Sequence, residues 1–367
     1  MTKLILGLPH LSQGALYQAA LRMNAPVMVS SSCLARWKTI EHRGIRAREW
    51  QSWNTAPLDR CIGSGLEIHL DSAGFVAMAV RGGYDWTPES YVSDLVAHPA
   101  VTRASSMDLC VEREIAADRI AVEERIAKTI NLNHRCYDIA CDLGVDGKLM
   151  RVIQGDTAED YLRCFDAIEG IIPHGAAIGV GSMCRRATGG ANGAVSIVQT
   201  LHDHLRPDVT LHLFGVKSDA AEACTVFGDR ISSVDSQAYG TRARMRAGEI
   251  RKTDPLFSKT DVFVAGVMEE WYARQSNRLA SPRLHTYQSE MEMGTPQPKR
   301  TVLQALEQQV RREFNELIAG GELDHDHYVG GRMLEECILE KLPFLPNGVL
   351  PGDAYRGSWQ LPEPALE

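Results

Sequence analysis

Hydrophobic residues along this chain fall into short runs that alternate with segments of helical periodicity. The segments VEREIAADRIAVEERIAKTINLNHRCYDIA and TAEDYLRCFDAIEGI carry apolar residues at i, i+3 and i+4, the spacing of an amphipathic helix. The runs between such segments have the length and apolar character of buried strands. Eight runs are expected to form strands: residues 4–8, 26–30, 66–70, 105–109, 149–153, 176–180, 211–214 and 231–234.

Repeated alternation of strand and helix predicts an α/β fold, and specifically a closed (β/α)8 TIM barrel. The periodicity alone also allows a doubly wound sheet. A long segment between the second and third runs contains Trp37, Trp50 and Trp53, and the pattern does not place it. A protein of 367 residues has the size of one such barrel with an appendage.

The hydrophobic pattern changes after about residue 255. DVFVAGVMEEWYARQSNRL and RTVLQALEQQVRREFNELIAG are expected to form two long helices, and a third is expected from Gly331 to Glu340. The last segment is rich in proline and glycine, which favours irregular structure. The expected organisation is a barrel over residues 1–255, a helical C-terminal extension that completes it over residues 256–345, and an irregular tail over residues 346–367.

Composition and charge restrict the cell compartment and the partners that can be expected. Nine scattered cysteines without a CxxC pair suit a reducing cytoplasm and argue against a disulfide framework. The sequence has no run of about 18 apolar residues and no signal-peptide pattern, so a cytoplasmic protein without a membrane partner is expected. The net charge of −8 disfavours bulk attraction to nucleic acid but leaves room for a local basic patch. Such a patch, GTRARMRAGEIRK, contains Arg242, Arg244 and Arg246, and by itself it is typical of a solvated helix face.

Polar residues and glycines follow the expected strands, at the end where barrel enzymes place their chemistry. Each also has a purely structural explanation: Asp71 as a helix cap, Asp235 as an Asx turn, and the glycine-rich loop as a tight turn or a phosphate cradle. Their joint occurrence at one barrel mouth favours a functional site. The candidates at strand ends are Asp71, Asp108, Gln154, Gly179, Gly181, Gly215 and Asp235.

Two carboxylates that face one site can carry out chemistry at a glycosidic carbon, because one attacks the anomeric carbon while the other handles the proton of the leaving group. Phe75 and Phe214 could stack on the two faces of a planar ring. A further carboxylate and an amide could read the edge of a purine, since guanine offers N–H donors and a carbonyl acceptor. These residue types favour transfer at a glycosidic or related carbon with a planar heterocycle.

Six motifs in this chain resemble, in order, those of the tRNA-guanine transglycosylase superfamily, whose (β/α)8 enzymes exchange guanine for a 7-deazaguanine base. LDSAGF resembles the family's LDSGGF/Y, MDLCVEREIAADR its FDEC-containing segment, and RVIQGD its IVQGG. AAIGVGSM is similar to AIGGLAVG, LHLFGVKS to YLMGVG, and SSVDSQAYGTRAR to FDCVLPTRNAR. The resemblance spans roughly residues 66–246.

The resemblance implies a role for each matching residue. Asp235 would be the nucleophile that attacks C1′ and holds a covalent intermediate, and Asp71 would be the general acid/base. Arg242 and Arg244 match a segment that meets substrate phosphates, which favours a phosphate track over a solvated face. Arg246, in the same basic patch, is also expected to bind phosphate. The expected base-binding residues are Phe75, Asp108, Gln154, Gly179, Gly181, Phe214 and Gly215, with Phe214 in place of a methionine.

Several positions depart from the superfamily pattern. Ala73 stands where a glycine is expected, Asp156 replaces the second glycine of IVQGG, and the glycine-rich motif is shortened. The tRNA enzymes carry a C-terminal zinc site of CxCxxC and a histidine, whereas the C-terminal part of this chain has only Cys337. The stretches DHDH and HRCYDIAC are too loosely spaced to replace that site, so no metal is expected.

Loss of the zinc site and the compact length make the chain most similar to the DNA-modifying, DpdA-like members from phages and bacterial genomic islands. The resemblance implies a glycosyltransferase, a DNA guanine transglycosylase that inserts 7-cyano-7-deazaguanine or a relative without a cofactor. Its partners would be DNA and the free 7-deazaguanine base, while the need for a partner ATPase and the formation of a homodimer stay open. Three alternatives remain: a tRNA-guanine transglycosylase without the usual zinc site, a non-catalytic nucleic-acid-binding paralogue, and an unrelated barrel enzyme that binds a phosphate at residues 179–182.

Overall fold

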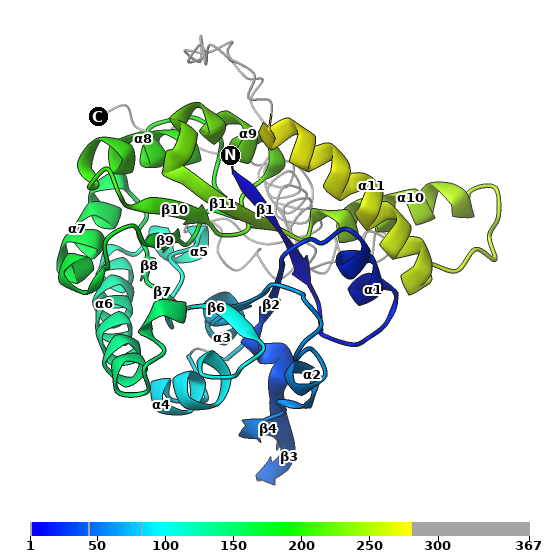
Figure 1. The fold of residues 1–367 in the computed structure, drawn as a ribbon, viewed down its shortest axis with the longest axis horizontal. Coiled ribbons are helices and arrows are strands. Elements are labelled where there is room, and N and C mark those ends of the chain that lie inside the picture. The colour runs from blue at the N-terminus through cyan, green and yellow to red at the C-terminus, as the bar shows by residue number, and fades with distance from the viewer. Residues whose placement is uncertain (1, 43–44, 82, 281–367) are drawn as a thin grey trace, which may run out of the picture. The chain divides into compact units, whose positions relative to one another are not determined.

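The computed structural model describes residues 2–42, 45–81 and 83–280 of the chain. Their dominant feature is a nine-stranded sheet in which every neighbouring pair of strands is parallel (Figure 1). In spatial order the strands are β7 (Leu149–Met150), β6 (Val101–Ser105), β5 (Ile68–Asp71), β2 (Val27–Ser30), β1 (Lys3–Leu8), β11 (Ile231–Ser236), β10 (Thr210–Leu213), β9 (Ala177–Val180) and β8 (Val152–Ile153).

The two ends of this sheet belong to one continuous piece of chain. Only Arg151 separates β7 from β8, so residues 149–153 pair with β6 on one side and with β9 on the other. The Arg151 carbonyl also accepts the Gly179 N–H at 2.7 Å. The nine strands of this sheet therefore form a nearly closed parallel barrel, which confirms the expected TIM-barrel fold over the doubly wound alternative.

The fourth strand differs from the one expected from the sequence. It is β6, whereas the apolar run at residues 105–109 continues from its last residue into the following loop. Met107, Leu109 and Val111 are buried although they lie in this loop, so their apolar character reflects packing and not strand formation. Asp108 accordingly lies beyond the strand, in the loop.

Helices follow the strands along the chain. Helices α6 to α9 lie outside the barrel and pack on one another in chain order, as successive βα units require (Figure 1). The helices are α1 (Ala15–Arg22), α2 (Ala56–Asp59), α3 (Gly74–Arg81), α4 (Pro88–Ser90), α5 (Arg113–Ala116), α6 (Arg119–Asp142), α7 (Ala158–Ile168), α8 (Ala194–His204), α9 (Ser218–Cys224), α10 (Ala238–Arg251) and α11 (Asp261–Ala280), with the short helical segments η1 (Ser31–Leu34), η2 (Tyr91–Val96), η3 (Asp146–Lys148), η4 (Glu169–Ile171) and η5 (Thr225–Arg230).

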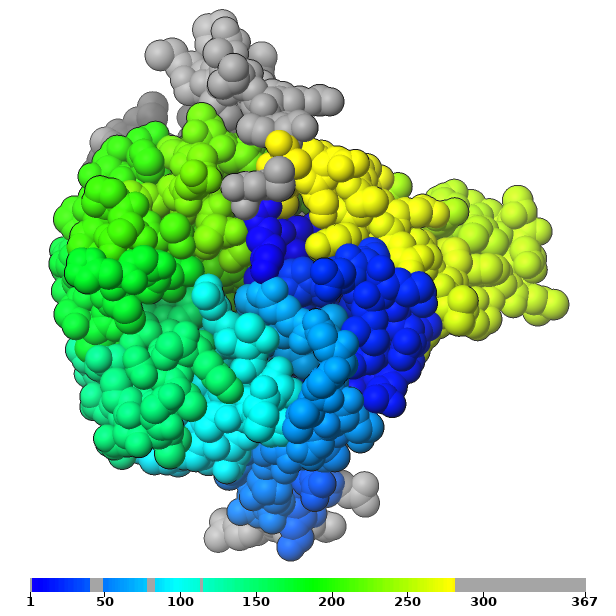
Figure 2. All heavy atoms as spheres, in the orientation of Figure 1, coloured from blue at the N-terminus to red at the C-terminus, as the bar shows by residue number. Residues whose placement is uncertain are grey.

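The tryptophan-containing insertion forms an antiparallel ribbon of two strands, β3 (Ala35–His42) and β4 (Ile45–Trp53), which extends away from the barrel (Figures 1 and 2). A ribbon of two strands is only marginally stable alone, so its base needs packing partners. Trp86 is such a partner, because its ring centroid lies 4.9 Å from that of Trp53 and 6.4 Å from that of Trp37, both edge-to-face. The Trp53 indole N–H donates to Ser90 Oγ at 3.0 Å.

The first expected C-terminal helix is confirmed as α11, which packs on α1, α9 and β1. The expected helices at residues 300–320 and 331–340, the tail and the DHDH stretch lie outside the described residues. The barrel and α11 form one compact unit, whereas residues 240–259 belong to another. The expected boundaries at residues 255 and 345 remain predictions. Every helix in the described ranges is too short or too polar to cross a membrane.

Candidate active site

A cavity of about 390 Å³ lies at the carboxyl ends of the barrel strands. It collects side chains from β5 and β11 and from the loops that follow β6, β8, β9 and β10. Parallel strands all end on the same side of a barrel, so residues that are far apart in sequence meet there. The predicted site residues that line this cavity are Asp71, Phe75, Asp108, Gln154, Gly181, Phe214, Gly215 and Asp235.

Asp235 lies in β11, and its carboxylate is held from the neighbouring strand. The Gly215 N–H donates to Asp235 Oδ1 at 2.8 Å. Gly215 follows β10 and has a φ of 58°, a left-handed conformation that glycine adopts without strain. A Cβ atom at this position would lie 2.9 Å from Cys184 Cβ, so the turn also lacks room for a side chain. The turn after β10 therefore fixes one oxygen of Asp235.

Asp71 is the last residue of β5, and its carboxylate contacts both the backbone and the cavity. Its Oδ2 accepts the Ala73 N–H at 3.2 Å, just before α3 begins. Burial, followed by the negative charges of Asp108 and Asp235, raises the pKa of Asp71 to about 7. A carboxyl group with a pKa near neutrality can donate and accept a proton, which suits a general acid/base. Accepting the Ala73 N–H ahead of α3 and transferring a proton are thus compatible roles for Asp71.

Two non-glycine residues near the site have a left-handed backbone conformation, with a positive φ. Ala73, at the position of an expected glycine, has a φ of 69° and is fully buried. Ser182, in the turn after β9, has a φ of 54°. Such a conformation costs a non-glycine residue roughly 1–2 kcal/mol, and strain of this kind concentrates at functional sites. The positive φ at position 73 therefore explains why the superfamily motif has a glycine there.

A chain of hydrogen bonds joins Asp108 to Gln154 in the wall of the cavity. Asp108 Oδ1 accepts the Ser72 hydroxyl at 2.7 Å, and Asp108 Oδ2 accepts the Gln154 amide N–H at 2.5 Å. The Ser182 hydroxyl donates to Gln154 Oε1 at 2.7 Å and accepts the Val111 N–H at 2.7 Å. Burial raises the pKa of Asp108, and the bonds from Ser72 and Gln154 oppose that rise. This network orients the Gln154 amide relative to Asp108.

Two glycines of the AAIGVGSM segment make room for side chains that reach the cavity. A Cβ atom at Gly181 would lie 2.0 Å from Gln154 Nε2, and one at Gly179 would lie 2.3 Å from Phe214 Cε2. Gly181 lines the cavity, whereas Gly179 packs against Phe214 and is not among the lining residues. The glycines thus position Gln154 and Phe214 by leaving space for them.

Both predicted aromatic residues line the cavity. The guanidinium carbon of Arg185 lies 5.0 Å from the centre of the Phe75 ring, a cation–π contact. The Phe214 ring meets the His212 ring edge-on, with the centroids 4.5 Å apart. Stacking of a base between Phe75 and Phe214 remains a prediction.

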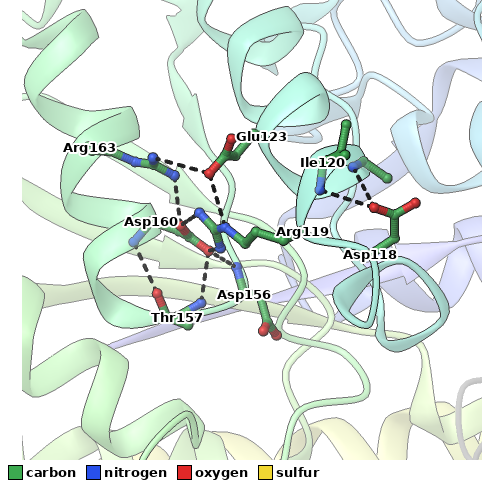
Figure 3. Close-up of polar contacts among 9 residues, drawn as sticks. Asp118, Arg119, Ile120, Glu123, Asp156, Thr157, Asp160 and Arg163 are labelled. Atoms are coloured by element: carbon green, nitrogen blue, oxygen red, sulfur yellow. Dashed lines mark hydrogen bonds and ion pairs between the residues drawn. The ribbon is translucent and has the colours of Figure 1, made fainter.

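The loop after β8 is anchored by Asp160 (Figure 3). The Asp160 carboxylate accepts the N–H groups of Asp156 and Thr157 at 3.2 Å each and completes a capping box at the start of α7. Arg119 and Arg163 donate to the same carboxylate from α6 and α7. Burial opposes ionisation, but Arg119 and the backbone N–H groups lower the pKa of Asp160 to about 2. Asp156, which replaces a family glycine, is thereby tied to α7 through its backbone.

The three predicted phosphate-binding arginines lie on α10, which begins two residues after β11 ends. Arg242 and Arg246 are exposed. Arg244 is half-buried and donates to Thr241 Oγ1 at 3.0 Å. None of the three is among the residues that line the cavity, and their contact with phosphates remains a prediction.

Other polar residues of the cavity were not selected from the sequence. Glu112 is buried, and its Oε1 accepts the Cys184 thiol at 3.4 Å. Cys110 and Gln237 also line the cavity. Glu112 and Cys110 stand inside the matched MDLCVEREIAADR segment, so the match of that segment was the signal that pointed to them.

No group of three or more His, Cys, Asp or Glu residues in the described ranges is arranged to hold a metal ion. The HRCYDIAC stretch lies on α6, where Cys136 is buried and Cys141 is exposed. Cys337 lies outside the described ranges.

Comparison with known proteins identifies the family of this chain. Residues 63–277 match the family described as DpdA, DeoxyPurine in DNA protein A. The match covers more than half of the 367 residues and contains every predicted catalytic, base-binding and phosphate-binding residue. No curated protein matches the chain significantly. The chain therefore belongs to the DpdA family, which implies a transglycosylase whose substrate is DNA.

Proposed function

We propose that this protein is a DNA guanine transglycosylase, a pentosyltransferase that exchanges guanine in DNA for 7-cyano-7-deazaguanine or a related base. The observation that carries the proposal is the pairing of Asp71 and Asp235 in one cavity, where the charge of Asp235 helps to raise the pKa of Asp71. Two carboxylates at one site, one of them protonated near neutrality, meet the needs of double displacement at a glycosidic carbon. Family membership supports DNA as the substrate.

In the first half of the exchange, guanine leaves the DNA. The target nucleotide leaves the base stack to enter the cavity, which costs a few kcal/mol. Asp235 attacks C1′, so the C1′–N9 bond breaks and an ester bond forms between C1′ and the carboxylate. Protonated Asp71 gives its proton to the departing base, and neutral guanine is released.

In the second half, the free 7-deazaguanine enters the same slot. Ionised Asp71 takes the N9 proton while N9 attacks C1′, and the ester bond to Asp235 breaks. Both carboxylates return to their starting states, so the exchange balances in atoms and charge without a co-reactant. Two inversions at C1′ give net retention of configuration.

Asp108 and Gln154 support recognition of the base. Guanine and 7-deazaguanines share the edge that carries the N1–H and exocyclic N–H donors and the carbonyl acceptor. The carboxylate of Asp108 can accept hydrogen bonds from these donors, and the amide of Gln154 can both donate and accept. Because Asp108 and Gln154 are already joined by a hydrogen bond, their geometry is set before the base arrives. The leaving and entering bases therefore use one site.

The α10 arginines complete the proposal. Arg242, Arg244 and Arg246 would hold the phosphates that flank the extruded nucleotide. Contacts of this kind position DNA without reading its sequence.

The test is incorporation of radiolabelled guanine into duplex DNA, single-stranded DNA and tRNA in parallel, by the wild type and by Asp235→Ala. Asp94→Ala, at an exposed aspartate, is the matched control. Label that enters DNA and is lost only in Asp235→Ala supports the reaction and the nucleophile together. Label in tRNA alone would assign the protein to the tRNA enzymes, and binding of DNA without any exchange would favour a non-catalytic paralogue.

A further inference from the structure

His212 is a buried histidine beside the proposed nucleophile. It lies in β10, its side chain is 1% exposed, and its Nε2 is 3.3 Å from Asp235 Oδ1. Its other ring nitrogen, Nδ1, lies 2.9 Å from Ser233 Oγ in β11. Among the described residues, Nε2 makes no hydrogen bond of good geometry. A buried polar nitrogen without a partner is costly, and the carboxylate of Asp235 is the polar group it faces.

The chemistry of the three groups selects one arrangement of protons. A hydroxyl donates and accepts, whereas an ionised carboxylate only accepts. If Ser233 donates to Nδ1, a ring proton of His212 is on Nε2, which lies 3.3 Å from Asp235 Oδ1. The other tautomer would place the Nε2 lone pair 3.3 Å from a carboxylate oxygen. The first arrangement places an N–H, and not a lone pair, beside the carboxylate oxygen, and the surroundings of the ring therefore favour it.

We propose that His212, oriented by Ser233, is a positioning residue for Asp235. Its Nε2–H and the Gly215 N–H approach the same carboxylate oxygen, Oδ1, one from β10 and one from the turn after it. The Gly215 N–H is hydrogen-bonded to Oδ1 and His212 Nε2 lies 3.3 Å from it, which leaves Oδ2 as the oxygen that attacks C1′. The inference rests on the proposed function and deepens it, since it names the attacking atom and the groups that aim it.

The same two donors act in both halves of the exchange. In the covalent intermediate Oδ2 is bonded to C1′, and Oδ1 is the carbonyl oxygen of the ester. When N9 of the 7-deazaguanine attacks C1′, the C1′–Oδ2 bond breaks and its electron pair returns to the carboxylate. Donors already fixed on Oδ1 stabilise the charge that develops there. His212 keeps its proton throughout, so the balance of the exchange is unchanged.

Packing holds the His212 ring in this orientation. The Phe214 ring lies edge-on to it at an interplanar angle of 81°. Rotation of the imidazole would therefore disturb the residue proposed to stack on the base. The buried histidine His69 differs from His212 in this respect, because its Nε2 is hydrogen-bonded to Glu67 Oε1 at 2.8 Å.

The first test measures single-turnover release of guanine from DNA by four variants. His212→Phe keeps a ring of similar size but loses the donor, and we expect release about ten- to a hundredfold slower, as for loss of one hydrogen bond to a charged group. In steady-state exchange, the KM for the free base should stay unchanged. His212→Gln retains an N–H donor and should recover most of the rate, and Ser233→Ala should lose less than His212→Phe. The control, His174→Gln, changes an exposed histidine and should keep the wild-type rate.

The second test needs no turnover. Nuclear magnetic resonance of ¹⁵N-histidine-labelled protein should show His212 protonated on Nε2, with a signal that moves in Asp235→Asn and not in His174→Gln, a change at an exposed histidine. An Nδ1-protonated ring, or a wild-type rate in His212→Phe, would overturn the inference. If the wild type exchanges no base while the Nε2–H signal responds to Asp235→Asn, the proposed function fails and the positioning of Asp235 stands.

Discussion

Changing Asp71 to asparagine should abolish exchange and at the same time stabilise the folded protein. The folded state raises the pKa of this carboxyl group from 3.8 to about 7. Between about pH 4 and pH 7 the folded protein therefore holds a proton that the unfolded chain has released. The free energy of unfolding falls as the pH rises through this interval and levels off above it, since the folded state binds more protons there.

The size of the effect follows from the shift. Each pKa unit corresponds to about 1.4 kcal/mol, so a shift of about three units costs the folded state at most about 4 kcal/mol above pH 7. Asparagine has nearly the same shape as aspartate, has no proton to lose, and can still accept the Ala73 N–H through its side-chain oxygen. The stability gained by Asp71→Asn should therefore grow by roughly 2–3 kcal/mol between pH 5 and pH 8.

Urea unfolding at the two pH values measures this double difference, and the guanine-exchange assay measures activity on the same preparations. Asp94→Asn makes the same substitution at an exposed aspartate and should track the wild type in both assays. If the unfolding curves of Asp71→Asn and wild type shift in parallel with pH, the carboxyl group is not protonated in the folded state. If Asp71→Asn exchanges guanine at the wild-type rate, Asp71 is not the acid/base.

Three further predictions address the supports of the site. Gly181→Ala should lower the exchange rate at least tenfold with an unchanged circular dichroism spectrum, because its Cβ would lie 2.0 Å from Gln154 Nε2; wild-type exchange would show that this amide is dispensable. Asp160→Ala should lower the free energy of unfolding in urea by about 1–3 kcal/mol, since two backbone N–H groups and two arginines lose their acceptor; an unchanged midpoint would contradict this. The double variant Arg242→Ala/Arg246→Ala should weaken DNA binding and reduce the slope of log K against log salt concentration by about 2. An unaltered slope would show that these arginines do not contact the phosphates.

The barrel and most of its site could be predicted from the sequence, because they depend on order along the chain. Alternating strands and helices close into a parallel barrel, and every parallel strand ends on the same side. Asp71, Gln154 and Asp235 could therefore be assigned to one mouth before their spacing was known. The position of β6 was predicted wrongly, because the apolar residues that follow it are buried in a loop and not in a strand.

Contacts between strands that are far apart in sequence could not be predicted in this way. His212 is an ordinary member of an apolar run until β10 pairs with β11 and brings it to Ser233 and Asp235. Gly179 matches a ligand-binding motif, but in the structure its missing side chain makes room for Phe214.

The pKa of Asp71 shows the same division between sequence and structure. The sequence determines that a carboxyl group stands at the end of β5, within a family motif. Its proton affinity depends on burial and on the distance to Asp108 and Asp235, which belong to other strands and loops. The burial of Asp71 and its distances to Asp108 and Asp235 are set only when the barrel closes. Desolvation and Coulomb interactions depend on position in space and not on position along the chain.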